Sequence, residues 1–265
     1  MATDAAAIDQ RSFSIGTVLS RAFGTIGDNP LVTLGIAFLF GALPQLLFSY
    51  FLTASLTMAD RSSTLGLAAV SLGSYAIFLL LSMLVQGALV RATIAYSDGH
   101  RASFSQCIGT GLAVAVPLIG LSILMLLGMM AGFALLLVPG IILFIMWSVA
   151  VPALVSEGTG VIGAFGRSRT LIKGGRWKIF GLFVLLLVLV WMFYAVFGAI
   201  ILAGGMLGSL GTAGGFTPSP TYLALSGIAS TLILAFWGAT QASLYIALRN
   251  WKDGPQGSNL ADIFA

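Results

Sequence analysis

Residues 179–203 read IFGLFVLLLVLVWMFYAVFGAIILA and decide the fold class, because they contain no Asp, Glu, Lys or Arg. A helix needs about 20 mainly apolar residues to cross the hydrocarbon core of a bilayer. The stretch meets that length and follows the basic segment Arg176-Trp177-Lys178 directly. Tryptophan and cations at the end of an apolar run are typical of the membrane interface. The sequence therefore predicts a membrane-spanning helix at about 177–203.

Uncharged runs of the same kind fill most of the chain, which is 58% hydrophobic and only 8% charged. The runs at 102–156 and 179–248 are too long for one span each. The first contains the break Pro139-Gly140, and the second contains the Gly/Pro/Ser/Thr-rich stretch 204–221. These runs predict an all-α membrane protein, a single polytopic domain over 1–265. Its six transmembrane helices are expected at about 31–56, 66–96, 111–135, 138–156, 177–203 and 222–249, with a cytoplasmic tail at 250–265.

The segment 111–156 has a second interpretation. Its second predicted span, 138–156, is short and is bounded by Pro139 and Pro152. Since proline interrupts helices and a short span does not reach across easily, a partial, re-entrant hairpin is the alternative to two full spans.

Amphipathic segments precede three of the predicted spans. In the first, apolar residues recur at helical spacing after Ser14, a candidate N-cap. The segments are expected to be interfacial helices at about 13–27, 102–110 and 160–174. The chain then divides into three hairpins, each preceded by an interfacial helix. Because each unit would cross the membrane twice, the repeats would be parallel, unlike the inverted repeats of many transporters.

The basic residues predict the orientation. Of the twelve lysines and arginines in the chain, only Arg61 falls on the side opposite to both termini in this topology. Under the positive-inside rule, this bias places both termini in the cytoplasm, as expected for a bacterial inner-membrane protein. The net charge of +4 then indicates a basic face against anionic lipid and not a nucleic-acid partner, since no basic recognition module accompanies it.

Small residues at every fourth position predict close helix packing in the last span. The stripe consists of Gly227, Thr231, Ala235, Ala239, Ser243 and Ala247. Gly128 and Gly132 form a shorter stripe in the third span. Packing within the bundle is the first interpretation and contact between copies of the chain is the second. Pro44, Pro139 and Gly140 are expected at hinges or turns.

The densest polar cluster follows the fourth predicted span. It consists of Glu157, Arg167, Arg169, Lys173, Arg176 and Lys178. A carboxylate near the start of the next helix is favoured by the helix dipole, and it could pair with Arg167 or Arg169. The cluster is therefore interpreted as a hinge-locking ion pair with lipid-headgroup anchors. A binding site for an anionic headgroup or a phosphorylated lipid is the alternative.

No residue pattern in the chain indicates catalysis. Paired carboxylates, histidine or cysteine clusters and phosphate-binding loops are absent from the sequence, which has one His and one Cys. We therefore expect no catalytic residue, no metal and no cofactor. No charged residue falls at a span centre either, which argues against a proton-coupled pump.

A further pattern consists of Leu137-Val138-Pro139-Gly140-Ile141, Pro152, Glu157-Gly158, Ala164, Arg167-Ser168, Leu171, Gly174, Trp177 and Phe180. At these residues the chain resembles the bacterial glycerophosphoryl diester phosphodiesterase membrane-domain family and related uncharacterised six-span inner-membrane proteins. The resemblance covers nearly the whole chain, and its specific block is Pro139–Phe180. Tyr245, Leu248-Arg249 and Asp253-Gly254 are also similar. The resemblance implies a six-helix membrane module and not phosphodiesterase chemistry, which in that family belongs to a separate soluble domain.

The function expected from the sequence is that of a non-enzymatic inner-membrane protein. It would act as a scaffold or accessory subunit that engages anionic lipid, partner membrane proteins or further copies of itself. The alternative is a carrier or binder of a lipid-like or apolar small molecule, and an uncoupled channel comes third.

Overall fold

The computed structural model of the chain describes residues 14–49, 64–203 and 220–254, which form helices with no β-strand among them. The elements in chain order are α2 (Ile15–Asp28), α3 (Pro30–Ala37), the π-helix η1 (Phe38–Ala42), α5 (Thr64–Ser97), α6 (Phe104–Ala113), α7 (Ala115–Leu135), α8 (Leu137–Trp147), α9 (Ala150–Glu157), α10 (Gly160–Ile172), α11 (Arg176–Ala203) and α12 (Pro220–Asp253). The prediction of an all-helical chain is thus confirmed for these residues. Residues 50–56 of the first predicted span and 255–265 of the tail lie outside them.

Five helical segments of the described chain are long and apolar enough to cross a membrane. They are Pro30–Ser49, Ala115–Leu135, Leu137–Glu157, Arg176–Ile200 and Thr221–Asp253. This agrees with a membrane protein. The second predicted span, at 66–96, is not among these five segments and falls within the long helix α5.

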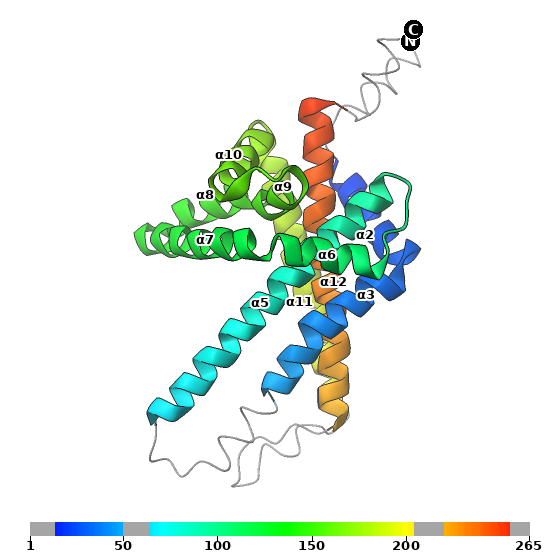
Figure 1. Cartoon of the computed structure of the whole chain (residues 1–265), viewed down its shortest axis with the longest axis vertical. Helices are drawn as coiled ribbons and strands as arrows, with labels where there is room; N and C mark the ends of the chain where they lie inside the picture. The colour runs from blue at the N-terminus through cyan, green and yellow to red at the C-terminus, as the bar shows by residue number, and fades with distance from the viewer. Residues whose placement is uncertain (1–13, 50–63, 204–219, 255–265) are drawn as a thin grey trace.

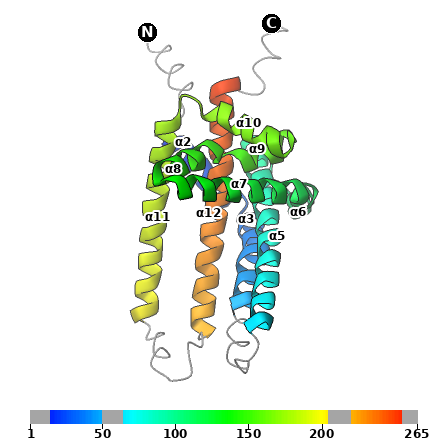
Figure 2. The same ribbon diagram turned by 90° about the vertical axis from the view of Figure 1, so that its left-hand side faces the viewer.

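The helices run in two directions (Figures 1 and 2). Figure 2 shows α11 and α12 along the long axis of the molecule with α3 and α5 beside them, although Figure 1 shows α3 and α5 oblique to α12, and α6 to α10 lie across the half of the molecule in which α11 begins. The end of this half, where α11 begins and α5 and α12 finish, carries Arg91, Arg167, Arg169, Arg176 and Arg249, and we call it the basic end. The α7–α8 hairpin lies crosswise in both views, which differs from a pair of upright spans.

Prolines account for the breaks between the crosswise helices. A proline inside a helix removes one N–H donor and clashes with the carbonyl four residues earlier. Pro117 follows the kink at Val114 that separates α6 from α7, and Pro152 follows the break at Ser148 and Val149 that separates α8 from α9. The predicted span at 138–156 is therefore two helices, of 11 and 8 residues.

Pro44 and Pro139 also lie at irregular backbone. Pro44 follows the π-helix η1, in which the Leu43 N–H bonds to the Phe38 carbonyl, so the helix absorbs the missing donor with a wider turn. Pro139 lies in the first turn of α8, where proline is tolerated, just after the extended residue Leu136.

The glycines of α7 and α8 permit the close antiparallel packing of this hairpin. A Cβ atom at Gly132 would lie 3.2 Å from the Gly140 Cα atom, and one at Gly128 would lie 2.3 Å from the Trp147 ring. The short stripe therefore packs against α8 within the chain.

The long stripe of α12 also faces inward. Gly227, Thr231, Ala235, Ala239 and Ser243 are buried, and Ala247 is half-buried. A Cβ atom on Gly227 would lie 2.8 Å from the Leu46 side chain. Packing within the bundle accounts for the burial of these residues without a second copy of the chain.

Polar contacts tie α2 and α3 to the loop between α5 and α6. Arg101 pairs with Asp28 through two contacts of 3.2 and 3.3 Å, and the Asn29 side chain donates to the Ala102 carbonyl at 2.9 Å. Ser103 begins α6 with a capping box that it forms with Gln106. Ser14 precedes α2, as predicted, but its side chain makes no capping hydrogen bond.

Candidate functional site

A tight turn places Glu157 at the basic end. Glu157 is the last residue of α9, and Gly158 and Gly160 follow with φ values of 61° and 72°. Glycine adopts this left-handed conformation readily, and Gly158 is a typical helix C-cap. The chain reverses within these residues and continues as α10, so that the side chains of α10 return over the end of α9.

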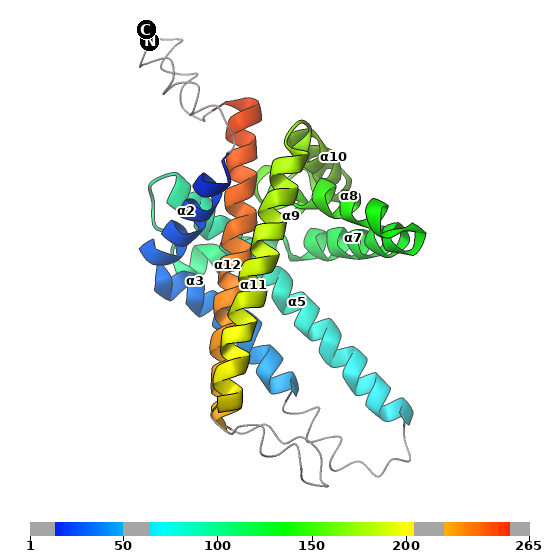
Figure 3. The same ribbon diagram turned by 180° about the vertical axis from the view of Figure 1, so that it is seen from behind.

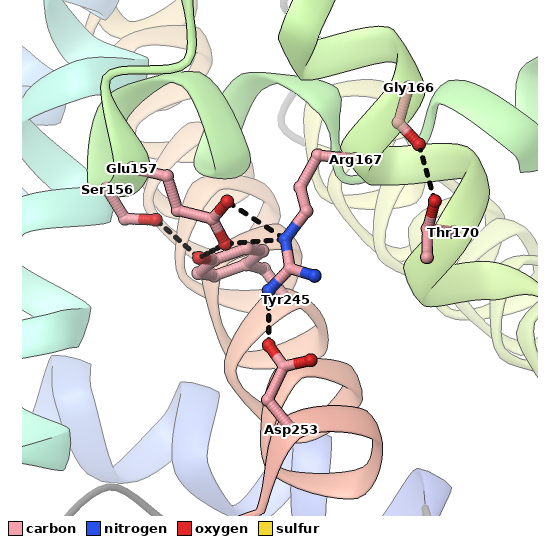
Figure 4. A network of polar contacts seen from close by, with 7 residues as sticks. All are labelled: Ser156, Glu157, Gly166, Arg167, Thr170, Tyr245 and Asp253. Atoms are coloured by element: carbon pink, nitrogen blue, oxygen red, sulfur yellow. Dashed lines mark hydrogen bonds and ion pairs between the residues drawn. The ribbon is translucent and has the colours of Figure 1, made fainter.

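Glu157 is the centre of a polar network that joins α9, α10 and α12 (Figure 4). The Arg167 Nε atom donates to both Glu157 carboxylate oxygens at 2.8 and 2.9 Å, and the Tyr245 hydroxyl donates to Glu157 Oε1 at 2.7 Å. The other side of the Arg167 guanidinium pairs with Asp253 near the end of α12. The Ser156 hydroxyl donates to the Tyr245 oxygen at 2.6 Å. We call these five residues the clamp.

Four members of the clamp are shielded from solvent, whereas the Asp253 side chain is 43% exposed. Tyr245 is fully buried, and the side chains of Arg167 and Glu157 are 24% and 22% exposed. The hydrogen bond to Asp253, together with the charge and hydrogen bonds of Glu157, raises the pKa of Arg167 further above its usual range, although burial opposes the shift. The guanidinium therefore remains charged, and the clamp holds α10 and the end of α12 together.

The other predicted cations do not belong to the clamp. Arg169, Lys173 and Arg176 are exposed, and no ion pair joins them to a carboxylate of the described residues. Lys178 is exposed as well and has an interaction of its own. The structure thus divides the predicted cluster, since Arg167 is bound within the protein and the cations around it face outward.

Ser168 links α10, which carries Arg167 of the clamp, to α8. Its hydroxyl donates to the Met146 carbonyl at 2.8 Å, close to the break between α8 and α9. A break in a helix frees carbonyl groups that need another partner. Ser168 therefore fixes α10 on the end of α8.

An apolar groove lies on another side of the molecule, between α2, α11 and α12. It has a volume of about 370 Å³. Its lining consists entirely of apolar residues, namely Phe23, Ile26, Leu189, Val190, Phe193, Leu232, Ile233 and Phe236. Figure 3 shows α11 beside α12, with α2 on the other side of α12.

Metal and thiol chemistry find no support in the described residues. Within 14–49, 64–203 and 220–254, no three His, Cys, Asp or Glu residues gather in a possible metal site. Cys107 is buried, and burial raises the pKa of its thiol to about 11. Because the thiolate is the nucleophile, this thiol is unreactive at neutral pH.

Sequence reasoning missed three members of the clamp. Ser156, Tyr245 and Asp253 were not among the predicted site residues. One signal was available, because Tyr245, Arg249 and Asp253 recur at every fourth position and so share one side of a helix. The pairing of that side with Glu157 depends on tertiary structure.

Comparison with known proteins gives one family. The sequence profile of a family described as a domain of unknown function, DUF7847, matches residues 102–248, which is more than half of the chain. This match covers α6 to α11 and most of α12. No curated protein and no solved structure matches the chain.

Proposed function

The chain belongs to the DUF7847 family, whose domain has no assigned function, and we propose from its own geometry that it is a non-enzymatic membrane scaffold or accessory subunit. Its basic end would engage anionic lipid headgroups on the cytoplasmic face of a bacterial inner membrane. The observation that carries this proposal is the row of outward-facing cations around the clamp.

The topology that we propose has four crossing helices. In this proposal the segment 30–49, α5, α11 and α12 cross the bilayer, while the α7–α8 hairpin lies flat in the cytoplasmic leaflet, which is supported by its crosswise direction in Figure 2. The segment Leu137–Glu157 is long enough to cross as a whole, but the break at Ser148 and Val149 divides it into α8 and α9, and the 11 residues of α8 alone span only about 17 Å. Both termini remain cytoplasmic in this topology. It lacks the two spans predicted at 111–135 and 138–156, and the loss of an even number of spans leaves the orientation of the other helices unchanged.

The α7–α8 hairpin suits a lipid environment. Large apolar side chains are exposed on several sides of α7 and at the turn that follows it, including Leu127, Met130, Phe133, Leu136 and Val138. Exposure of this kind would be unfavourable in water but needs no explanation in hydrocarbon. The hairpin would anchor the crosswise helices in the leaflet that the basic end faces.

The energy of lipid attraction comes from cations that no carboxylate neutralises. Arg169, Lys173 and Arg176 are exposed on α10 and at the start of α11. Each basic residue near an anionic membrane surface contributes about 1 kcal/mol. The clamp supports the arrangement, because Arg167 and Asp253 hold α10 in a fixed position.

Native mass spectrometry from nanodiscs of equal phosphatidylglycerol and phosphatidylcholine content tests this function. We expect the lipids that remain bound to be enriched in phosphatidylglycerol. The triple variant Arg169→Gln, Lys173→Gln, Arg176→Gln should lower the enrichment, whereas Arg169→Lys with Arg176→Lys should retain it. Bound lipids with the composition of the nanodisc would contradict the proposal.

One observation favours a second function, the binding of a lipid-like or apolar molecule. The apolar groove has a volume within the range of about 300–1,000 Å³ that ligand pockets show. In the same experiment, a retained apolar molecule that Val190→Trp removes would support this function, because the larger side chain fills the groove.

A further inference from the structure

A polar pocket lies where four helices meet at the basic end. Its walls come from α5, α6, α9 and α12, and its volume is about 470 Å³. The lining residues are Arg91, Ile94, Gln106, Gly109, Thr110, Val155, Ser156 and Arg249. The elements around it contact one another directly, so the pocket is part of the packed structure. Neither the predicted lipid contacts nor the family match accounts for it.

The charge of this pocket is not balanced. Arg91 and Arg249 both line it, and no carboxylate does. In the described part of the chain, Asp28 pairs with Arg101, while Glu157 and Asp253 pair with Arg167. Neither guanidinium of the pocket lies within 4.0 Å of a described carboxylate. The two positive charges of Arg91 and Arg249 therefore share one pocket, and no carboxylate of the described residues neutralises them.

The hydrogen-bonding groups of the lining favour an acceptor as ligand. The Thr110 hydroxyl donates to the Gln106 backbone carbonyl at 2.9 Å, and the Ser156 hydroxyl donates to Tyr245. The side-chain oxygen of Gln106 accepts from the Ser103 N–H, which leaves its amide NH₂ as a donor. The donors left for a ligand are thus this amide, the Arg91 guanidinium and the N–H groups of Arg249 that do not face the Tyr245 hydroxyl.

A phosphate group matches this set of donors. It carries negative charge on several oxygens, and arginine binds such oxygens with paired, charge-assisted hydrogen bonds. We propose that Arg91 and Arg249, with the Gln106 amide, bind the phosphate group of a phospholipid or of a soluble phosphate compound in this pocket. The proposal rests on the proposed function in the lipid case, since it assigns one headgroup to a defined site.

The clamp supports the pocket from one side. Ser156 belongs to both, and Arg249 lies beside the Tyr245 hydroxyl. Glu157 does not oppose an anion, because Arg167 neutralises its charge. The cations of α10 are separate from the pocket, so the two sets can be tested independently.

Two kinds of variant test the pocket in the purified full-length chain. Arg91→Gln with Arg249→Gln removes its charge, and Lys252→Gln removes an exposed charge outside the pocket as a control. Gln106→Glu supplies a carboxylate inside the pocket while preserving the capping box, in which glutamate is favoured at this position. It tests the pocket even where the double variant fails to fold.

The measurement is the rise in melting temperature with added phosphatidylglycerol or inorganic phosphate, because a ligand of the folded state stabilises it. We expect the wild type and the control to respond, and both pocket variants to need at least about tenfold more ligand. A response to phosphatidylglycerol alone identifies a lipid, and a response to inorganic phosphate identifies a soluble compound.

Pocket variants that respond like the wild type would overturn the site, as would a wild type that responds to neither ligand. The lipid enrichment measured in nanodiscs decides separately whether the proposed function stands.

Discussion

Replacing Glu157 by alanine is expected to lower the free energy of unfolding by about 1–3 kcal/mol, because it removes the acceptor of the Tyr245 O–H and leaves one side of Arg167 without a partner. A fully buried charge left unpaired would cost more, about 3–5 kcal/mol, but the Arg167 side chain is 24% exposed and water compensates in part. Thermal unfolding in a mild detergent measures the change.

Arg169→Ala is the matched control for this prediction. Arg169 follows Arg167 on α10 but is exposed and makes no ion pair with a described residue, so its loss should change stability by no more than about 0.5 kcal/mol. A double-mutant cycle of Glu157→Ala and Arg167→Ala should also show coupling. Equal melting temperatures for Glu157→Ala and Arg169→Ala would mean that the clamp does not stabilise the fold.

Two glycines of α6 are expected to respond to alanine with opposite signs. A Cβ atom at Gly111 would lie 2.8 Å from the Leu84 backbone oxygen of α5, and backbone cannot move aside as a side chain can. Gly111→Ala should therefore destabilise the protein by about 1–3 kcal/mol through overpacking. Gly109 has no atom within 4 Å of such a Cβ, and Gly109→Ala should stabilise the helix by about 0.5–1 kcal/mol.

The same thermal measurement checks this pair. Because both changes add one methyl group to the same helix, effects of composition cancel in the comparison. Two variants with the same melting temperature would show that α6 does not pack against α5 in this way.

Much of the helical architecture could be predicted from the sequence, because its signals are local. Uncharged runs identify apolar helices, and the helices α2, α6 and α10 lie within a few residues of the predicted interfacial segments. The direction of α7 could not be predicted in this way. This mainly apolar helix of 21 residues is long enough to cross a bilayer, and length alone does not fix orientation.

The candidate site, like the direction of α7, could be predicted only where its signals are local. Glu157 and Arg167 are ten positions apart, so sequence reasoning could propose their pairing, but it could not choose between Arg167 and Arg169. Tyr245 lies 88 positions from Glu157, and only the packing of α12 brings them together. Arg91 and Arg249 read as two ordinary cations at span ends until the fold places them in one pocket.

The membrane topology is the central claim of this account, since the proposed headgroup contacts require the crosswise helices α6 to α10 to lie on the cytoplasmic side. The most direct measurement is labelling of Leu136→Cys in a Cys107→Ser background, in intact spheroplasts, with a membrane-impermeant maleimide. Ser209→Cys, in the predicted outer loop, is the positive control, and a permeant maleimide shows that each thiol can react. Four crossing helices with a flat α7–α8 hairpin predict that the impermeant reagent labels Ser209→Cys but not Leu136→Cys. Labelling of Leu136→Cys by the impermeant reagent would place this turn on the outer side of the membrane and contradict the account.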